Sequence, residues 1–297
     1  MLIDFRYRTL ATRFLTIPVR AIKKYKLMAI RPKLFKKMTK LIASSVSAGR
    51  YSVRLASSEK EIQAAQKLRY EVLFKESGGR ITREMLNTER EEDEWDHVAY
   101  HVVVVDSSLD NQVVGTVRLV SNQALDEGQS FYTELAFDLS GLKNNYTRVL
   151  ELSRACVSPE GRGGAILMLI WKFTMQFIEQ NHYQVLFGCA SFKGTDYLHH
   201  TEILSYLYDK HLASDALMPR AKNSVQSVAI KDFSQTPGKG KERGKVPTML
   251  RGYLKIGARI SDHAVIDPIF NTTFVAIYVD ANEMFGIKHA LVNKSVD

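Results

Sequence analysis

The sequence is poor in cysteine and has no long apolar run. Its 297 residues include two cysteines, Cys156 and Cys189, and both lie inside apolar segments. So few thiols exclude a disulfide-built fold and favour a reducing compartment. No zinc-type spacing of cysteine and histidine occurs, so no metal site is expected. No stretch of about 18 uncharged apolar residues occurs either, so we expect no segment that spans a bilayer.

Acidic residues are almost absent from the first 50 positions. That stretch holds 13 Lys and Arg against Asp4 alone, a net charge of +12, whereas the whole chain carries +9, so the other 247 residues carry −3. Between the lysines, apolar residues recur at helical spacing: Leu34, Phe35, Met38, Leu41 and Ile42. Residues 1–50 are therefore predicted to form a basic amphipathic segment lying on an anionic membrane surface.

Three other interpretations of the basic segment remain open. It could be a disordered arm, a nucleic-acid-binding arm or an organelle transit peptide. The rest of the chain is slightly acidic and the segment contains no recognisable DNA-reading pattern, so we expect no nucleic-acid partner. We expect a cytoplasmic protein associated peripherally with the inner face of the cytoplasmic membrane.

Residues 51–285 show the alternating pattern of a single α/β or α+β domain, and 286–297 form a tail. Period-two or continuous apolar runs predict strands over 51–56, 98–106, 112–120, 149–157, 185–190 and 274–279. Helices are predicted after Ser57 or Ser58, over 165–180, over 195–212 with Thr195 as cap, and over 246–258. We expect a short helix or turn over 135–142, a solvated acidic loop over 76–95 and a long loop or lid over 218–245. The fold class is a mixed sheet with helices on both faces.

A glycine-rich turn joins an apolar strand to a long helix. The strand carries Glu151 and Arg154, which alternation places on opposite faces, and the turn contains Arg162, Gly163 and Gly164. The N-terminus of the following helix points backbone N–H groups at its surroundings and favours negative charge. The turn is therefore predicted to bind the phosphate of an acyl-donor phosphopantetheine arm, although such turns more often bind nothing.

Several spaced motifs resemble the acyl-homoserine-lactone synthases, which have the GNAT acyltransferase fold. The matching residues are Arg69, Asp93-x-x-Asp96, Gly115-x-x-Arg118-Leu119 and Glu151-Leu-Ser-Arg154. The fuller resemblance, over about residues 51–280, is to bacterial L-ornithine Nα-acyltransferases. It adds two longer runs that the synthases lack, 187–195 and 247–258, and Phe270-Asn-Thr-Thr273. The resemblance implies an N-acyltransferase that moves a 3-hydroxyacyl chain from acyl carrier protein to the α-amino group of L-ornithine, with no cofactor.

Amide formation needs a neutral amine, so a nearby carboxylate is useful as general base, directly or through water. Glu151 is the candidate, with a structural salt bridge to Arg118 or Arg154 as the alternative. Backbone N–H groups over Ala155 to Val157, that of Cys156 included, are expected to stabilise the oxyanion. The Cys156 side chain is expected to be a small buried hydrophobe, with no role as nucleophile.

The remaining candidates are charged groups expected to meet the amino acid. Asp93 and Asp96 could accept hydrogen bonds from an ammonium group. Arg69, Arg118 and Arg154 could bind the carboxylate or orient those aspartates. Three other functions stay open: an acyl-homoserine-lactone-type synthase, an acyltransferase for another amino acid, and a non-enzymatic lipid- or carrier-binding module.

Overall fold

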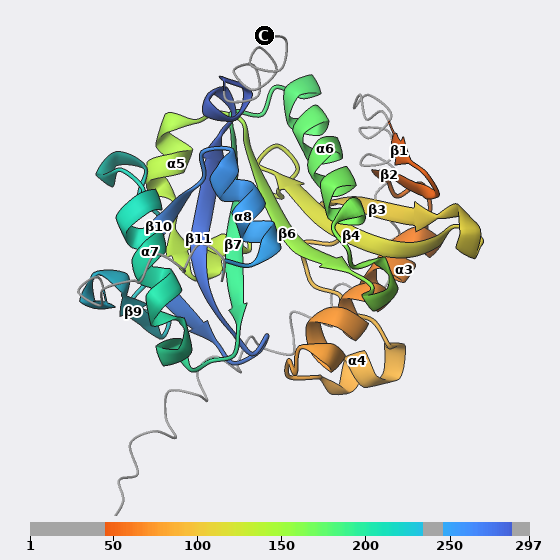
Figure 1. Cartoon of the computed structure of the whole chain (residues 1–297), viewed down its shortest axis with the longest axis horizontal. Helices are drawn as coiled ribbons and strands as arrows, with labels where there is room; N and C mark the ends of the chain where they lie inside the picture. Colours follow the sequence, from red (N-terminus) through yellow and green to blue (C-terminus); the bar gives the residue numbers. More distant parts are fainter. Residues whose placement is uncertain (1–44, 234–245, 287–297) are drawn as a thin grey trace, which may run out of the picture. The chain divides into compact units, whose positions relative to one another are not determined.

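The computed structural model describes residues 45–233 and 246–286, and its centre is a nine-stranded sheet (Figure 1). In sheet order the strands are β1 (Val46–Ala48), β2 (Tyr51–Leu55), β3 (Tyr100–Asp106), β4 (Gln112–Ser121), β6 (Val149–Val157), β7 (Val185–Lys193), β11 (Thr272–Asp280), β10 (Arg259–Asp267) and β9 (Ser227–Ala229). A separate two-stranded sheet joins β5 (Phe137–Asp138) to β8 (Arg220–Ala221). The mixed sheet confirms the predicted fold class.

One pair of neighbours in the large sheet is parallel. Strands β6 and β7 pair from Val149↔Val185 to Leu152↔Gly188, and beyond that point they separate. Strand β6 stays paired with β4 as far as Val157, and β7 stays paired with β11 as far as Lys193. The sheet therefore opens into a V at its centre.

Helices cover both faces of the sheet. The main ones are α3 (Glu59–Arg69), α4 (Arg83–Thr88), α5 (Ser140–Asn145), α6 (Ala165–Gln180), α7 (Thr201–His211) and α8 (Thr248–Lys255). Short 3₁₀ turns span Ser107–Leu109, Thr133–Leu135, Pro159–Gly161, Tyr197–His200, Asp215–Leu217 and Ile230–Phe233. Figure 1 shows α6 and α8 in front of the sheet. On β4, Gly115 faces Ile166 of α6, whereas Arg118, on the opposite face, shares Asp96 with Arg69 of α3.

Helix α3 begins as the sequence predicts and ends in an unusual way. The Ser58 side chain caps it by accepting the N–H of Glu61. The helix then continues as a π-helical segment over Tyr70–Glu76, which ends at Ser77. Such segments are rare and frequently lie at functional sites.

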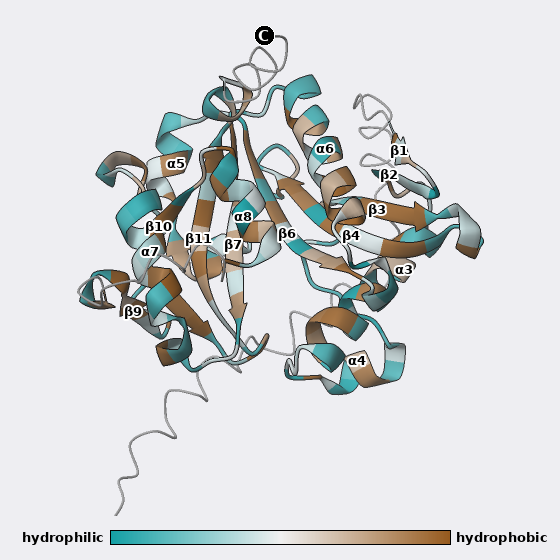
Figure 2. Ribbon diagram, viewed as in Figure 1, coloured by the Kyte–Doolittle hydropathy of each residue, from teal (hydrophilic) through white to brown (hydrophobic). Residues whose placement is uncertain are grey.

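Apolar side chains concentrate in the strands and on the inner faces of the helices. In Figure 2 the central strands are mostly brown, whereas α5 and α7 turn teal residues outward. Helix α6 buries Ile166, Ile170, Phe173 and Phe177 against the sheet, as its apolar sequence predicts. Its bounds, and those of β6, agree with the predicted ranges 165–180 and 149–157.

Five expectations need correction. Residues 76–95 are not a plain solvated loop, because they contain α4 and the buried Glu91. The expected loop over 218–245 contributes β8 and β9, and 234–245 lie outside the described residues. Strand β10 has no counterpart among the predicted strands. Asp196, and not Thr195, caps the helical segment that follows.

The fifth correction concerns the boundary of the basic segment. Strand β1 falls inside the range 1–50 but pairs with β2, so the folded sheet begins before Tyr51. The predicted amphipathic helix around Leu34 to Ile42 lies outside the described residues. In the ranges that the structure describes, no helix is both long and apolar enough to cross a bilayer.

Candidate active site

A bulge in β6 turns Arg154 out of the regular strand. The register between β4 and β6 shifts between Thr116 and Arg118, and Arg154 has a φ of 55°. The guanidinium lies between two aromatic rings, 4.3 Å from the Tyr132 centroid and 4.6 Å from that of Phe270. The backbone N–H of Tyr132 donates a hydrogen bond to the Glu151 carboxylate, so Glu151 and Arg154 both contact the loop that carries Tyr132. Their expected placement on opposite faces is wrong, because the bulge breaks the alternation.

The point at which β6 and β7 separate is set by close backbone contact. A Cβ at Gly188 would lie 2.2 Å from the carbonyl oxygen of Leu152, so no side chain fits there. The group that approaches this glycine is the backbone of β6.

Behind Arg154, three arginines and three carboxylates form a buried ion-pair cluster. Its members are Arg69, Arg118, Arg154, Glu91, Asp93 and Asp96. The Asp96 carboxylate accepts hydrogen bonds from both terminal nitrogens of Arg69, each at 2.8 Å, and from one terminal nitrogen of Arg118 at 2.9 Å. Arg154 donates to Glu91 at 2.9 Å and to Asp93 at 2.7 Å. The charges balance within the cluster, as buried charges require.

The electrostatics of the cluster fix its protonation. Burial alone would raise the pKa of Asp96, but Arg69 and Arg118 outweigh it and hold that pKa well below its ordinary value. The pKa of Asp93 is likewise lowered, because Arg118 and Arg154 overcome the effect of burial. Both aspartates are therefore charged at neutral pH.

Glu151 is fully buried and does not pair with an arginine. Its carboxylate accepts the backbone N–H of Thr133 at 2.7 Å and that of Tyr132 at 3.3 Å. Neither Arg118 nor Arg154 lies within ion-pair distance of it, so the salt-bridge alternative is not realised. Burial raises the pKa of Glu151, and hydrogen bonds from Thr133 offset only part of that shift. Glu151 therefore anchors the Tyr132–Thr133 turn and is more basic than an ordinary carboxylate.

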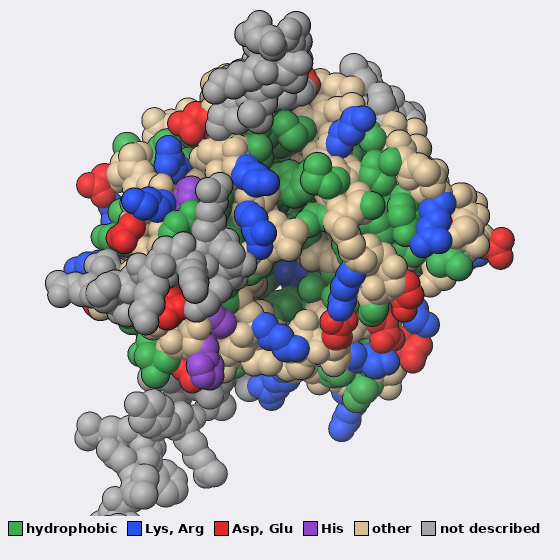
Figure 3. Space-filling model, viewed as in Figure 1, with side chains coloured by type: hydrophobic (Ala, Val, Ile, Leu, Met, Phe, Trp, Pro, Cys, Tyr) green, Lys and Arg blue, Asp and Glu red, His purple; other side chains and the backbone are tan. Residues whose placement is uncertain are grey.

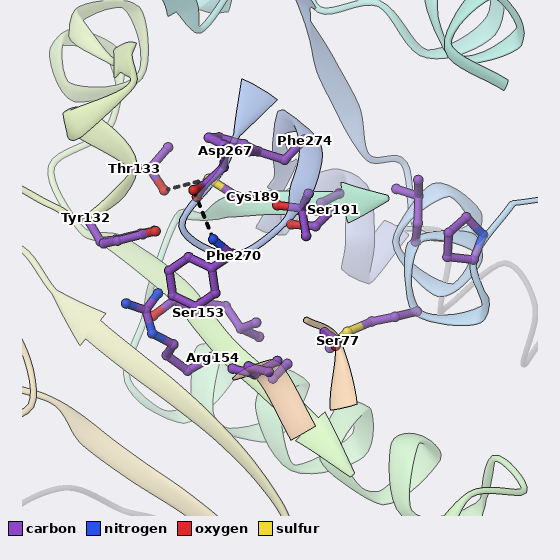
Figure 4. Close-up of a pocket in the computed structure, with 18 of the residues that line it drawn as sticks. Ser77, Tyr132, Thr133, Ser153, Arg154, Cys189, Ser191, Asp267, Phe270 and Phe274 are labelled. Atoms are coloured by element: carbon purple, nitrogen blue, oxygen red, sulfur yellow. Dashed lines mark hydrogen bonds between the residues drawn. The ribbon is translucent and has the colours of Figure 1, made fainter. Parts of the chain in front are cut away.

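A cavity of about 240 Å³ occupies the V between β6 and β7. Figure 3 shows the hollow near the centre of this face, bordered by hydrophobic and basic side chains. Its apolar lining comprises Leu73, Leu152, Pro247, Met249, Leu250, Tyr253, Phe270 and Phe274. Its polar lining comprises Ser77, Tyr132, Thr133, Ser153, Arg154, Cys189, Ser191, Asp267 and Thr272. In Figure 4, Tyr132, Thr133, Asp267 and Arg154 gather at one end of the cavity, with Ser77 at the other.

Residues 68–172 match the acetyltransferase (GNAT) domain family. An L-ornithine N(alpha)-acyltransferase of Rhodobacter capsulatus is 32% identical over 238 residues, which cover 79% of this chain and 91% of that protein. One of Brucella abortus is 36% identical over 236 residues, which cover 77% of this chain and 84% of that protein. A solved CoA-dependent acyl-homoserine lactone synthase is 13% identical, covers 78% of this chain and 82% of its own, and has a TM-score of 0.41.

The chain belongs to the L-ornithine N(alpha)-acyltransferase family. It is an acyltransferase with a GNAT-like fold, and this decides for an enzyme over a non-enzymatic binding module.

Within this acyltransferase, the predicted substrate-binding residues do not line the cavity. Arg69, Arg118 and Asp96 are buried, and Asp93 is 18% exposed at its side chain. Their polar atoms bind one another, and the cluster reaches the cavity only where Arg154, bound to Glu91 and Asp93, forms part of the wall. Among the three arginines, Arg154 is therefore the one placed to meet a ligand.

The glycine turn has the predicted strand–turn–helix geometry. Gly163 and Gly164 have φ values of 152° and 94°, which L side chains rarely adopt, and Gly164 is the N-cap of α6. No side chain caps that helix end in the described structure. Arg162 forms a two-point ion pair with Glu76 at 2.7 and 2.6 Å, which ties the turn to the π-helical segment. The ion pair therefore links the turn to the residue before Ser77, which lines the cavity.

Cys156 is a small core residue of the acyltransferase, as expected. Its side chain packs with Ala65, Leu68 and Val72, and burial raises the pKa of its thiol to about 12. Cys156 pairs with Thr116 of β4, and the backbone N–H of Ser158, two residues later, donates to the carbonyl of Val114. Because backbone N–H groups of alternate residues point the same way along a strand, the N–H of Cys156 also points toward β4. Alternation turns the N–H of Val157, which also belongs to the expected range of oxyanion donors, toward the opening.

Sequence reasoning missed four residues that the structure brings into the site. Glu91 completes the ion-pair cluster, and Tyr132, Thr133 and Asp267 line the cavity. Glu91 lies in an acidic run that looked solvated, and its pairing with Arg69 and Arg154 spans 22 and 63 positions. No local pattern marks the other three, because the fold alone brings their segments together.

Proposed function

We propose that this acyltransferase moves a 3-hydroxyacyl chain from acyl carrier protein to the α-amino group of L-ornithine, giving a lyso-ornithine lipid. The observation that carries the proposal is the mixed lining of the cavity in the V between β6 and β7. Apolar side chains such as Leu250 and Phe274 suit the start of an acyl chain, and polar ones such as Thr133 and Arg154 suit an amino acid. Acceptor specificity for L-ornithine is supported by the names of the relatives.

Proton removal from the amine falls to Glu151 through the turn that it anchors. Thr133 lines the cavity, and both its backbone N–H and its side chain hydrogen-bond to Glu151 behind it, so the Thr133 hydroxyl can pass a proton to the carboxylate. The neutral amine nitrogen then attacks the thioester carbon, the C–N bond forms and the C–S bond breaks. The phosphopantetheine thiolate leaves and takes up the second amine proton, so the products are the amide and the free thiol. A carboxyl with a raised pKa is matched to this task near neutral pH.

The ion-pair cluster serves the reaction by holding Arg154 in place. Arg69, Arg118, Asp93 and Asp96 act as positioning residues, in place of the direct substrate contacts that the sequence suggested. They fix the Arg154 guanidinium against the Tyr132 and Phe270 rings, where it can receive the acceptor carboxylate. This arrangement gives orientation without requiring a mobile arginine at the cavity wall.

The donor binds across the N-terminus of α6. The open backbone N–H groups after Gly164, with Arg162 beside them, suit the phosphodiester of a phosphopantetheine arm. Helix α8 lines the cavity with Met249, Leu250 and Tyr253, and carries Arg251 and Lys255 but no acid. A positive border of this kind favours a negatively charged donor.

The test is free-thiol release by the purified full-length chain. The reactions contain 3-hydroxyacyl carrier protein or the matching acyl-CoA, with L-ornithine, L-lysine, L-glutamine, glycine or S-adenosylmethionine, and product masses are read from the same reactions. We expect ornithine-dependent release from the carrier protein and a lyso-ornithine lipid mass. Release with another acceptor alone would contradict the proposed substrate, and faster release from acyl-CoA would contradict the proposed donor.

The basic N-terminal segment would keep the enzyme at an anionic membrane, where an acylated amino acid partitions. Removing residues 1–44 spares β1 and takes away most of the positive charge. We expect this deletion to weaken binding to anionic liposomes in a flotation assay and to leave turnover in solution unchanged. Equal flotation of the two chains would contradict membrane binding by this segment.

A further inference from the structure

Two charged residues line the cavity in the described part of the chain, Arg154 and Asp267. Arg154 is held by Glu91 and Asp93 within the balanced cluster. Asp267 belongs to no such arrangement, because no described lysine, arginine or histidine lies within ion-pair distance of it. The polar end of the cavity therefore carries one negative charge that the described residues leave uncompensated.

The local structure directs Asp267 toward the cavity. It is the last residue of β10, and its Oδ1 accepts the backbone N–H of Ile269 at 2.8 Å and that of Phe270 at 3.1 Å. These bonds fix the carboxylate at the end of the strand and occupy one of its two oxygens. In Figure 4 the side chain lies near Thr133 and Cys189, above the Phe270 ring.

The charge of Asp267 is felt by the groups around it. Burial raises the pKa of the Cys189 thiol to about 12, and the charges of Glu151 and Asp267 add to that shift. Burial also raises the pKa of Tyr132, again with a contribution from Asp267. Asp267 therefore lies at the same end of the cavity as the Thr133–Glu151 pair and Arg154.

We propose that Asp267 binds the side-chain ammonium of a diamino acid acceptor and thereby selects such acceptors over those with a neutral side chain. This inference rests on the proposed function and adds a specificity residue to it. An acceptor with its carboxylate at Arg154 and its α-amine at Thr133 extends its second ammonium to the free carboxylate oxygen of Asp267. The role of ammonium acceptor, which the sequence suggested for Asp93 and Asp96, thus passes to a residue outside the cluster.

The variant Asp267→Asn tests the charge of this side chain while it keeps the side chain's hydrogen bonds. An asparagine Oδ1 still accepts the two backbone N–H groups of Ile269 and Phe270, so the turn is retained, whereas the negative charge is lost. Asp267→Glu retains the charge on a longer side chain. Asp209→Asn removes an exposed aspartate from α7 and serves as the matched control.

The acceptors are L-ornithine and L-norvaline, which has the same carbon chain without the δ-amino group. We measure kcat/KM for each with saturating 3-hydroxyacyl carrier protein. In the unmodified enzyme we expect kcat/KM for ornithine to exceed that for norvaline by about 10- to 100-fold, because one hydrogen bond to a charged group contributes about that factor. Asp267→Asn should lower the ornithine value by about that factor, leave norvaline unchanged, and so abolish the preference, whereas Asp267→Glu should retain part of it.

The results distinguish the two proposals. An unmodified enzyme that does not turn over L-ornithine would overturn the proposed function and this inference with it. Turnover of ornithine with an unchanged ornithine-to-norvaline ratio in Asp267→Asn would overturn the inference alone. Equal losses with both acceptors would also overturn it, because they would assign Asp267 to the reacting amine or to the fold.

Discussion

The two sides of the cavity present charge in opposite ways. On the side of β4 and β6, three arginines meet three carboxylates and the charges cancel inside the protein. On the side of β10, Asp267 faces the cavity with no described cation against it. Balanced charges in a protein interior hold side chains in position, whereas an unbalanced charge on a cavity wall is available to a ligand. In the proposed binding mode, the balanced side therefore positions Arg154 for the acceptor carboxylate, and Asp267 on the other side meets the side-chain ammonium.

The largest expected effect comes from breaking the balanced side. Asp96→Asn removes a charge shared by Arg69 and Arg118 and leaves two buried guanidiniums short of a partner. We expect the free energy of unfolding to fall by about 3–5 kcal/mol, measured by urea denaturation. The exposed control Asp209→Asn should stay within about 0.5 kcal/mol. A loss no larger than that of the control would show that the cluster does not stabilise the fold.

The next effect concerns rate and its dependence on pH. Glu151→Gln keeps the size of the side chain and removes the base, so kcat should fall by about 10²- to 10⁴-fold. The base acts when deprotonated, and its pKa is raised from the ordinary 4.5, so the unmodified rate should decline with falling pH already above pH 4.5. Stopped assays across pH measure both effects.

The control for this prediction is Glu127→Gln, an exposed glutamate in the loop after β4. It should leave kcat and the acidic limb unchanged. If Glu151→Gln retains the full rate, Glu151 serves only to anchor the Tyr132–Thr133 turn.

A smaller effect is expected where the two sides separate. In Gly188→Ala the new Cβ would meet the Leu152 carbonyl, so the strands must shift, at a cost of about 1–3 kcal/mol in unfolding free energy. Gly286→Ala places a Cβ where no atom of the described residues lies within 4 Å and is the matched control. Thermal unfolding that does not distinguish the two variants would mean that β6 and β7 separate without the close contact at Gly188.

The smallest change in stability is expected for Asp267→Asn. Asp267→Asn keeps both hydrogen bonds to the following backbone and breaks no described ion pair, so its unfolding free energy should change by no more than about 0.5 kcal/mol. Urea denaturation of Asp267→Asn and Asp96→Asn under the same conditions compares the two unfolding free energies. A loss as large as that of Asp96→Asn would place Asp267 among the structural charges.

The local elements could be predicted from the sequence where pattern and caps agree. Strand β6 and helix α6 carry continuous apolar runs separated by a glycine turn, and the structure confirms both ranges. The run from Glu76 to Trp95 was harder, because its acids look solvated until distant arginines are brought to them. Strand β10 was missed because its polar Ser261, Asp262 and His263 interrupt the apolar alternation.

The sequence by itself determined the family, the mixed fold and most of the charged residues around the site, because those depend on motifs and on hydrophobic periodicity; Glu91 and Asp267 were missed. Only the tertiary structure decided what each charge does. A bulge turned Arg154 toward Tyr132, burial placed Glu151 behind Thr133, and β10 brought Asp267 to the cavity across more than 100 positions of sequence. Pairing and exposure of charges depend on these long-range contacts, which no local pattern encodes.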